Sequence, residues 1–284
     1  MNKDLNLLKN DLYIREFIQD NNLSDDFLNE NYNVFLRLLD SRKKCLNCNG
    51  LNECRQGSSG QRLSLRYDGV LIEEVEYCNY GLSKQNKANL KSSYVYCDIP
   101  NHLLDIDLNN TEFKDNQKEL YLKLASILHN KTNKGLYISG DLGVGKTYLC
   151  IALCNSLVKN GNKVAFVKVS NFFNEMRSLI GTNESLDRKI SILKNCDYLV
   201  LDDIGSETVS EFVRDDILFP ILDYRLENKL ITIFTSNLNK DDLLRHYQYD
   251  RKEKANLMNA KRLLERIDIL SEDYVLDGKN LRRY

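Results

Sequence analysis

The segment at residues 140–147 restricts the fold of this chain more than any other feature, because it has the spacing of a phosphate-binding loop. It reads GDLGVGKT and fits the pattern G-x-x-x-x-G-K-[ST], between an apolar run at 135–139 and a helical pattern. Glycines let backbone N–H groups turn toward phosphates, and the start of the helix adds its positive end. The lysine of such a loop reaches the β- and γ-phosphates, and the threonine hydroxyl binds Mg²⁺. We therefore expect the following residues to bind a nucleotide: Gly140, Asp141, Leu142, Gly143, Val144, Gly145, Lys146 and Thr147.

Apolar strands alternate with helical patterns through the second half of the chain. This alternation is typical of βαβ units, in which helices cover both faces of a parallel sheet. A helix before the first strand is expected to begin after Thr111, which suits an N-cap. We therefore predict an α/β P-loop domain over residues 111–284. Its expected strands lie at 135–139, 163–169, 197–201 and 230–235.

Polar side chains follow two of these strands, where a P-loop protein holds its metal ion and the attacking water. Asp202 and Asp203 come directly after an apolar strand, and Asn237 follows the last strand. We expect Asp202 to bind Mg²⁺ and Asp203 to orient or deprotonate the water, with Glu207 as a nearby substitute. Asn237 can hydrogen-bond the water and the γ-phosphate without adding charge.

The composition is that of an ordinary globular protein. Of 284 residues 42% are hydrophobic, with two Pro and 13 Gly, which excludes collagen, extensive disorder and a disulfide-dense miniprotein. The net charge is -1, so any binding to nucleic acid or to an acidic membrane must be local. The acidic N-terminus lacks a signal-peptide segment, and no window approaches the ~18 consecutive apolar residues of a membrane span. We expect a cytoplasmic protein with no membrane partner.

The first 98 residues are expected to form a small α+β domain. Apolar residues recur at spacings of three and four over 1–44, which predicts amphipathic helices. Residues 62–78 alternate apolar and polar positions about an Asp-Gly turn, which indicates a β-hairpin. The pattern weakens from 79 to about 111, so we expect a connecting segment there, with a linker that ends near residue 110.

Eight cysteines exceed what packing requires, and four of them are clustered. Cys45 and Cys48 form a Cys-x-x-Cys pair, Cys54 follows, and Cys78 ends the hairpin. Thiolates suit Zn²⁺, and a closed tetrahedral site stabilises a domain that is too small for a large core, so we expect structural zinc. Cys97 is a weaker alternative fourth ligand, and a redox pair or simple packing are the other interpretations. The remaining cysteines are expected in cores: Cys150, Cys154 and Cys196.

A resemblance to a known family rests on five segments, which read in order GDLGVGKT, YLVLDDIGSE, FTSN, KRLLERIDIL and LDGKNLRRY. They resemble the boxes of AAA+ ATPases of the bacterial replicative helicase loader group, and the Cys-bearing region looks like that group's N-terminal domain. The resemblance implies that Asn237 is the first sensor, Arg266 a finger that acts on a neighbouring subunit's ATP, and Arg282 the second sensor. The chain departs from the wider AAA+ pattern at Asp203, where most members have Glu, which puts the rate of hydrolysis in doubt. From spacing alone, Arg262 and Arg266 fit a solvated basic face paired with acidic neighbours.

The resemblance implies an ATPase that loads the replicative helicase hexamer onto single-stranded DNA in primosome assembly, with ATP, Mg²⁺ and structural Zn²⁺ as cofactors. The N-terminal domain would dock on the helicase, and the AAA+ domain would self-associate, engage single-stranded DNA and hydrolyse ATP weakly until assembly or DNA stimulates it. Three alternatives stay open: a transposition-helper ATPase, a P-loop kinase of small molecules, and an adaptor that binds ATP with negligible turnover. The zinc module favours the loader over the first, and the lack of an Arg-rich lid disfavours the second.

Overall fold

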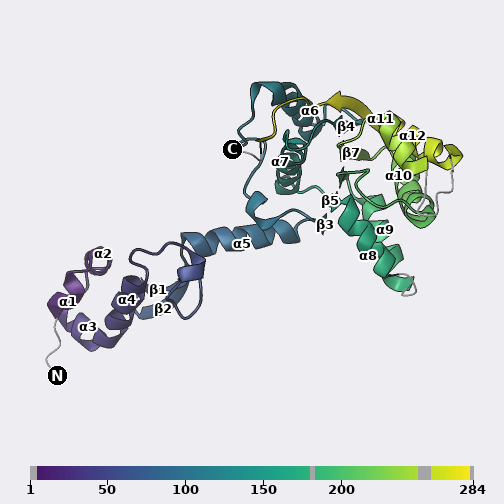
Figure 1. Ribbon diagram of the computed structural model, residues 1–284. Helices are drawn as coiled ribbons and strands as arrows, with labels where there is room; N and C mark the ends of the chain where they lie inside the picture. Colours follow the sequence, from purple (N-terminus) through teal and green to yellow (C-terminus); the bar gives the residue numbers. More distant parts are fainter. Residues whose placement is uncertain (1–4, 180–182, 249–256, 282–284) are drawn as a thin grey trace. The chain divides into compact units, whose positions relative to one another are not determined.

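The chain divides into two compact units (Figure 1). Residues 1–88 form the first unit and residues 89–284 the second, so the division falls within helix α5, Asn79–Ser92. This computed structural model describes three stretches of the chain: 5–179, 183–248 and 257–281.

The first unit combines short helices with a hairpin, as the periodicity predicts. Two of the helices begin at side-chain caps, because Asp11 and Ser24 each accept a backbone N–H of the first turn. The hairpin strands pair antiparallel, and their apolar side chains share one core with the helices around Phe35 and Leu65. The elements are α1 Leu5–Lys9, α2 Leu12–Asp20, α3 Asp25–Glu30, α4 Tyr32–Lys44, β1 Gln61–Tyr67 and β2 Leu71–Tyr77.

The segment from 79 to 111 differs from the predicted linker. Helix α5 occupies its first part, and Gly81 is the buried residue of this helix, so its side chains lack the apolar period on which a prediction depends. Beyond α5, Tyr94, Ile99 and Leu108 are buried in the core of the second unit. Residues 89–110, which we expected to connect two domains, are therefore part of the second unit.

Thr111 is not the N-cap that we expected. Its hydroxyl donates to the carbonyl oxygen of Asp107, and helix α6 begins only at Lys118, after a short 3-10 turn at Asp115–Gln117. The hydroxyl is thus used within the preceding loop.

The second unit is built on a parallel sheet whose described strands have the order β3-β5-β6-β7-β4-β8. All four predicted strands are present, each within one residue of its expected bounds, which confirms the α/β fold. The two edge strands were not predicted. The strands are β3 Tyr96–Cys97, β4 Gly135–Ser139, β5 Val164–Lys168, β6 Tyr198–Asp202, β7 Ile231–Ser236 and β8 Ser271–Val275.

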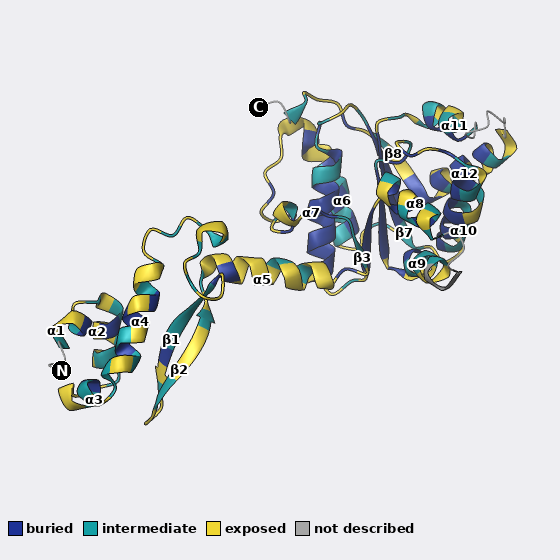
Figure 2. Ribbon diagram, turned by 60° about the horizontal axis from the view of Figure 1, so that its bottom comes forward, coloured by how far each residue is buried: buried dark blue, intermediate teal, exposed yellow. Residues whose placement is uncertain are grey.

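Helices cover both faces of this sheet, and Figure 2 shows the buried strands between the two helical layers. Helices α6 and α7 pack on one face through residues such as Leu124 and Ile151. Residues such as Phe172, Ile221 and Leu263 form the second core on the other face. The helices are α6 Lys118–Leu128, α7 Lys146–Lys159, α8 Val169–Ser178, α9 Asn183–Asn195, α10 Phe219–Glu227, α11 Lys240–Gln248 and α12 Leu257–Leu270.

Candidate functional site

Three neighbouring strands bring the predicted site residues together. Strands β6, β7 and β4 are adjacent in the sheet and parallel, so their carboxyl ends lie at one edge. The acidic pair ends β6, Asn237 follows β7, and the phosphate-binding loop follows β4. Ligands of open α/β sheets bind at this edge.

The phosphate-binding loop is formed as the motif predicts. Gly140, Gly143 and Gly145 have positive φ angles of 145°, 80° and 105°, which a side chain would oppose. Gly145 is the N-cap of α7, so the positive end of that helix faces the loop. Lys146 Nζ donates to the carbonyl oxygens of Gly140 and Asp141 at 2.7 and 2.8 Å. Its ammonium group thus lies inside the loop, where phosphate oxygens would replace the carbonyls.

Asp202 is almost fully buried beside the first turn of α7. Its Oδ1 accepts hydrogen bonds from Thr147 Oγ1 at 2.8 Å and from Thr235 Oγ1 at 2.7 Å. Burial raises the pKa of the Asp202 carboxyl above its ordinary value, although the two hydroxyl groups oppose the shift. A buried carboxylate next to a threonine hydroxyl has the donor chemistry for Mg²⁺. The two residues that the sequence predicts as Mg²⁺ ligands are thus in contact.

Asp203 and Asn237 connect the acidic pair to the P-loop lysine. Asn237 Nδ2 donates to Asp203 Oδ1 at 2.8 Å, and Lys146 Nζ donates to Asn237 Oδ1 at 2.9 Å. Asp203 has a φ of 62°, in the left-handed region that few residues other than glycine adopt, and its N–H donates to Thr235 Oγ1. Strained backbone of this kind is common at functional sites.

Thr235 is the residue of this cluster that the sequence reasoning missed. Its single hydroxyl donates to Asp202 and accepts from the backbone of Asp203, so it fixes both acids relative to β7. Thr235 could have been predicted from its position, because it lies near the end of the strand that leads to Asn237.

Glu207 does not serve as the substitute base that we considered. It is 4% exposed, its Oε2 accepts the N–H of Gly205, and its Oε1 is hydrogen-bonded to the hydroxyl of Tyr247. Both carboxylate oxygens of Glu207 are therefore used to hold the loop that follows Asp203.

Arg266 lies on α12, where acidic residues of the same chain bind it. It pairs with Asp223 at 3.2 Å and with Glu265 at 2.8 Å, and together with Arg262 it lies over the ring of Phe219. The structure therefore pairs this basic face with acidic neighbours, as spacing alone suggested. Arg282, the expected second sensor, lies outside the described residues.

The four clustered cysteines lie in the first unit, half-buried and without disulfides. Backbone N–H groups of Gly60 and Gln56 lower the pKa of the Cys54 thiol, and Gly60 also accepts the N–H of Cys78. The Gln56 side chain donates to Cys45 Sγ at 3.2 Å. Among residues 5–179, 183–248 and 257–281, no three His, Cys, Asp or Glu side chains surround a common point. The thiol chemistry fits zinc, whereas the present arrangement shows no metal centre.

The other cysteines have structural positions. Cys97 lies in β3 of the second unit against its core, where burial raises the pKa of its thiol. Cys150, Cys154 and Cys196 are buried, as expected.

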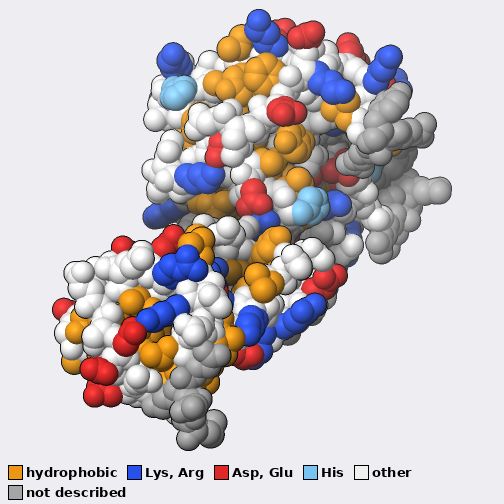
Figure 3. Space-filling view, turned by 90° about the vertical axis from the view of Figure 1, so that its left-hand side faces the viewer, with side chains coloured by type: hydrophobic (Ala, Val, Ile, Leu, Met, Phe, Trp, Pro, Cys, Tyr) orange, Lys and Arg blue, Asp and Glu red, His pale blue; other side chains and the backbone are white. Residues whose placement is uncertain are grey.

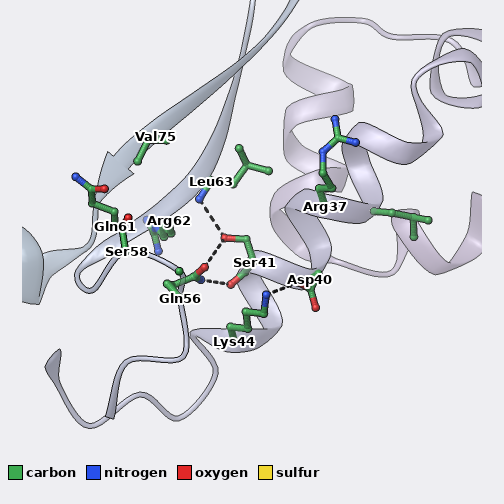
Figure 4. Close-up of a pocket in the computed structure, with 12 residues that line it drawn as sticks. Arg37, Asp40, Ser41, Lys44, Gln56, Ser58, Gln61, Arg62, Leu63 and Val75 are labelled. Carbon is green, nitrogen blue, oxygen red and sulfur yellow. Dashed lines mark hydrogen bonds and ion pairs between the residues drawn. The ribbon is translucent and has the colours of Figure 1, made fainter. Parts of the chain in front are cut away.

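A cavity of about 450 Å³ lies in the first unit, between α4 and the hairpin (Figure 4). Ser41 accepts the N–H of Leu63 and donates to Gln56, and Asp40 pairs with Lys44. These polar side chains of the cavity are thus hydrogen-bonded or ion-paired with one another.

Comparisons with known proteins agree with this geometry. The family described as "IstB-like ATP binding protein" matches residues 62–274. The replicative helicase loader DnaI of Bacillus subtilis (strain 168) is 27% identical over 282 residues, 95% of this chain and 89% of that protein. The replicative helicase loader DnaC of Escherichia coli (strain K12) is 32% identical over 108 residues, 37% of this chain and 43% of that protein.

Solved structures resemble about two thirds of the chain. A crystal structure of DnaI aligns with a TM-score of 0.56 and 29% identity, over 68% of this chain and 98% of that one. A crystal structure of the DnaC helicase loader aligns with a TM-score of 0.52 and 23% identity, over 62% of this chain and 99% of that one, and it shows a shared fold. In the part of the chain that the structure describes, no helix has both the length and the apolar composition for crossing a bilayer.

Proposed function

The chain belongs to the family of IstB-like ATP-binding proteins, and from this premise we propose that it uses ATP to load the replicative DNA helicase onto single-stranded DNA. The observation that carries the proposal is the similarity to the Bacillus subtilis loader DnaI over 95% of this chain. A P-loop domain alone is compatible with many functions. This similarity, however, extends through the first unit, which the nucleotide chemistry does not require.

ATP binds with its phosphates in the loop 140–147. Lys146 exchanges two loop carbonyls for the β- and γ-phosphate oxygens, and the N-terminus of α7 stabilises the same negative charge. Thr147 and Asp202 would hold Mg²⁺, which neutralises charge on the phosphates. When ATP is bound, phosphate oxygens thus take the place of the loop carbonyls that Lys146 contacts without nucleotide.

Hydrolysis uses the row formed by Lys146, Asn237 and Asp203. Asn237 lies between the lysine and the acid, so its amide can hold the attacking water against the γ-phosphate while Asp203 accepts the proton. The side chain of Asp203 is shorter than Glu, and its backbone is held by Thr235, which limits its reach. Slow basal hydrolysis, stimulated by assembly or DNA, follows from this limited reach.

Self-association supplies a further positive charge, that of Arg266, to the ATP of a neighbouring subunit. Arg266 is held at the surface of α12 by Asp223 and Glu265, and it acts on the ATP of a neighbouring subunit after leaving these partners. Arg282 is proposed as the second sensor on the resemblance alone.

The first unit docks on the helicase. It exposes large hydrophobic side chains, among them Val75 and Tyr77 of β2. On the face shown in Figure 3, groups of hydrophobic side chains lie among charged ones, and exposed apolar groups with a polar rim are typical of interaction surfaces. Structural zinc held by the clustered cysteines stabilises this unit, and the ligands are Cys45, Cys48, Cys54 and Cys78.

A pull-down from a cell extract tests the proposal. The full chain is used as bait with ATP, and Lys146→Ala serves as the variant that does not bind nucleotide. Recovery of a hexameric DNA helicase is the expected result, with a yield that differs between the two baits. Recovery of a transposase in its place would identify a transposition helper, and recovery of neither protein would also contradict the proposal.

A further inference from the structure

A buried glutamine outside the sequence motifs contacts the phosphate-binding loop. Gln117 ends the short turn before α6 and is 3% exposed. Its side-chain Nε2 donates to the carbonyl oxygen of Val144 at 2.8 Å, and its Oε1 accepts the N–H of Lys114 at 3.0 Å. Both ends of the amide are therefore hydrogen-bonded, and one end lies on the loop.

The same amide occupies the space beside the last glycine of the loop. A Cβ atom on Gly145 would lie 2.3 Å from Gln117 Nε2, far inside van der Waals contact. The glycine thus serves two purposes, since it also adopts a φ of 105°. Its missing side chain lets the amide reach the carbonyl of Val144.

The direction of one carbonyl sets the direction of the next N–H. In a trans peptide the C=O and the following N–H point to opposite sides, and the described residues include no cis peptide. Because Gln117 holds the carbonyl of Val144 on its own side, the N–H of Gly145 points away from Gln117. An anion-binding loop requires such N–H groups to converge on its interior.

We propose that Gln117 is a positioning residue for ATP: it holds the Val144–Gly145 peptide in the orientation that binds phosphate. This role rests on the proposed function, in which the loop binds ATP. The neighbouring peptide is held in the same manner, because the N–H of Leu281 donates to the carbonyl oxygen of Gly143 at 2.9 Å. Two successive loop carbonyls are thus bound by groups from distant parts of the chain.

The test compares Gln117→Met with Asn155→Leu in the full chain. Methionine matches glutamine in length and removes both hydrogen bonds. Asn155 is an equally buried amide of the same unit, which donates to the carbonyl oxygens of Leu103 and Ile106, and so its loss destabilises the unit without touching the loop. The dissociation constant for ATP is measured in the presence of Mg²⁺, at a temperature well below the melting temperatures of both variants. The rise in melting temperature that ATP causes is measured as well.

The ATP dissociation constant of Gln117→Met is expected to rise about tenfold, which is the effect of losing one hydrogen bond between the loop and a phosphate. The rise in melting temperature that ATP causes should be smaller in this variant than in the wild type. Asn155→Leu should melt earlier and bind ATP as the wild type does. Equal ATP affinity of Gln117→Met and the wild type, or equal weakening in both variants, would overturn the role of Gln117. If Gln117→Met does not fold, Gln117→Asn decides by the same criteria, because its shorter amide does not reach both partners. A wild-type chain that binds no ATP would instead refute the proposed function.

Discussion

At the scale of a single residue, Mg²⁺ binding and burial favour different protonation states of Asp202. Its carboxylate must be ionised to hold Mg²⁺, yet it is 4% exposed, and burial raises its pKa. Between the ordinary pKa of an aspartate and this raised value, the folded state binds more protons than the unfolded chain. The free energy of unfolding therefore falls as pH rises through that window. In the absence of nucleotide, the ionised Asp202 carboxylate therefore lowers the free energy of unfolding.

Replacing Asp202 with Asn should separate stability from function. The amide oxygen can still accept from Thr147 and Thr235, whereas the buried charge is gone. At pH 7 to 8, the nucleotide-free Asp202→Asn variant should melt above the wild type, and the difference should narrow as pH falls. Its Mg²⁺-dependent phosphate release should drop ~10²-fold or more. Melting curves at several pH values check the first effect, and a lower melting temperature of the variant at pH 8 would contradict it.

At the scale of elements, the central strands were predictable and the edges were not. Strands such as β6 are buried on both faces and therefore read as continuous apolar runs. Strand β3 has two residues, and β8 reads SEDYV with exposed acids, so neither shows an apolar run. Helix α5 is mostly exposed and has no apolar face. The contacts of Gln117 and Leu281 with the loop join residues distant in sequence, for which no local pattern exists.

The hairpin and the loop before it provide a prediction about metal removal. If zinc joins Cys54 and Cys78 to the Cys45–Cys48 pair, the full chain should contain ~1 zinc per molecule. Cys54→Ser and Cys78→Ser should each lose most of this zinc, and chelation should lower the melting temperature of the first unit. Cys97→Ser is the matched control, because Cys97 belongs to β3, and it should retain zinc.

Metal analysis of purified protein decides between these outcomes. Less than half an equivalent in the wild type would exclude the structural zinc site. Loss of zinc from Cys97→Ser, with retention in Cys78→Ser, would move the fourth ligand to the second unit.

At the scale of the whole molecule, our proposal assigns helicase docking to the first unit and nucleotide chemistry to the second. The P-loop and the side chains around it belong to the second unit and do not depend on residues of the first. The family match begins at residue 62, and the similarity to the B. subtilis loader extends over both units. The sequence motifs predicted which side chains lie together at the end of the sheet, namely those of Lys146, Thr147, Asp202, Asp203 and Asn237. They did not predict the contacts of Glu207 with Gly205 and Tyr247, or the pairing of Arg266 with Asp223 on α10, because these contacts depend on how separate helices and loops pack.

Transfer of the helicase onto closed circular single-stranded DNA is the direct measure of helicase loading by this chain. Helicase that remains on the circle is measured after free protein is removed, with the full chain, with Lys146→Ala and without either. We expect several-fold more helicase on DNA with the wild-type chain and ATP, and background levels with Lys146→Ala. Equal amounts of helicase on the circle with and without the wild-type chain, under conditions where that chain binds ATP, would contradict this expectation.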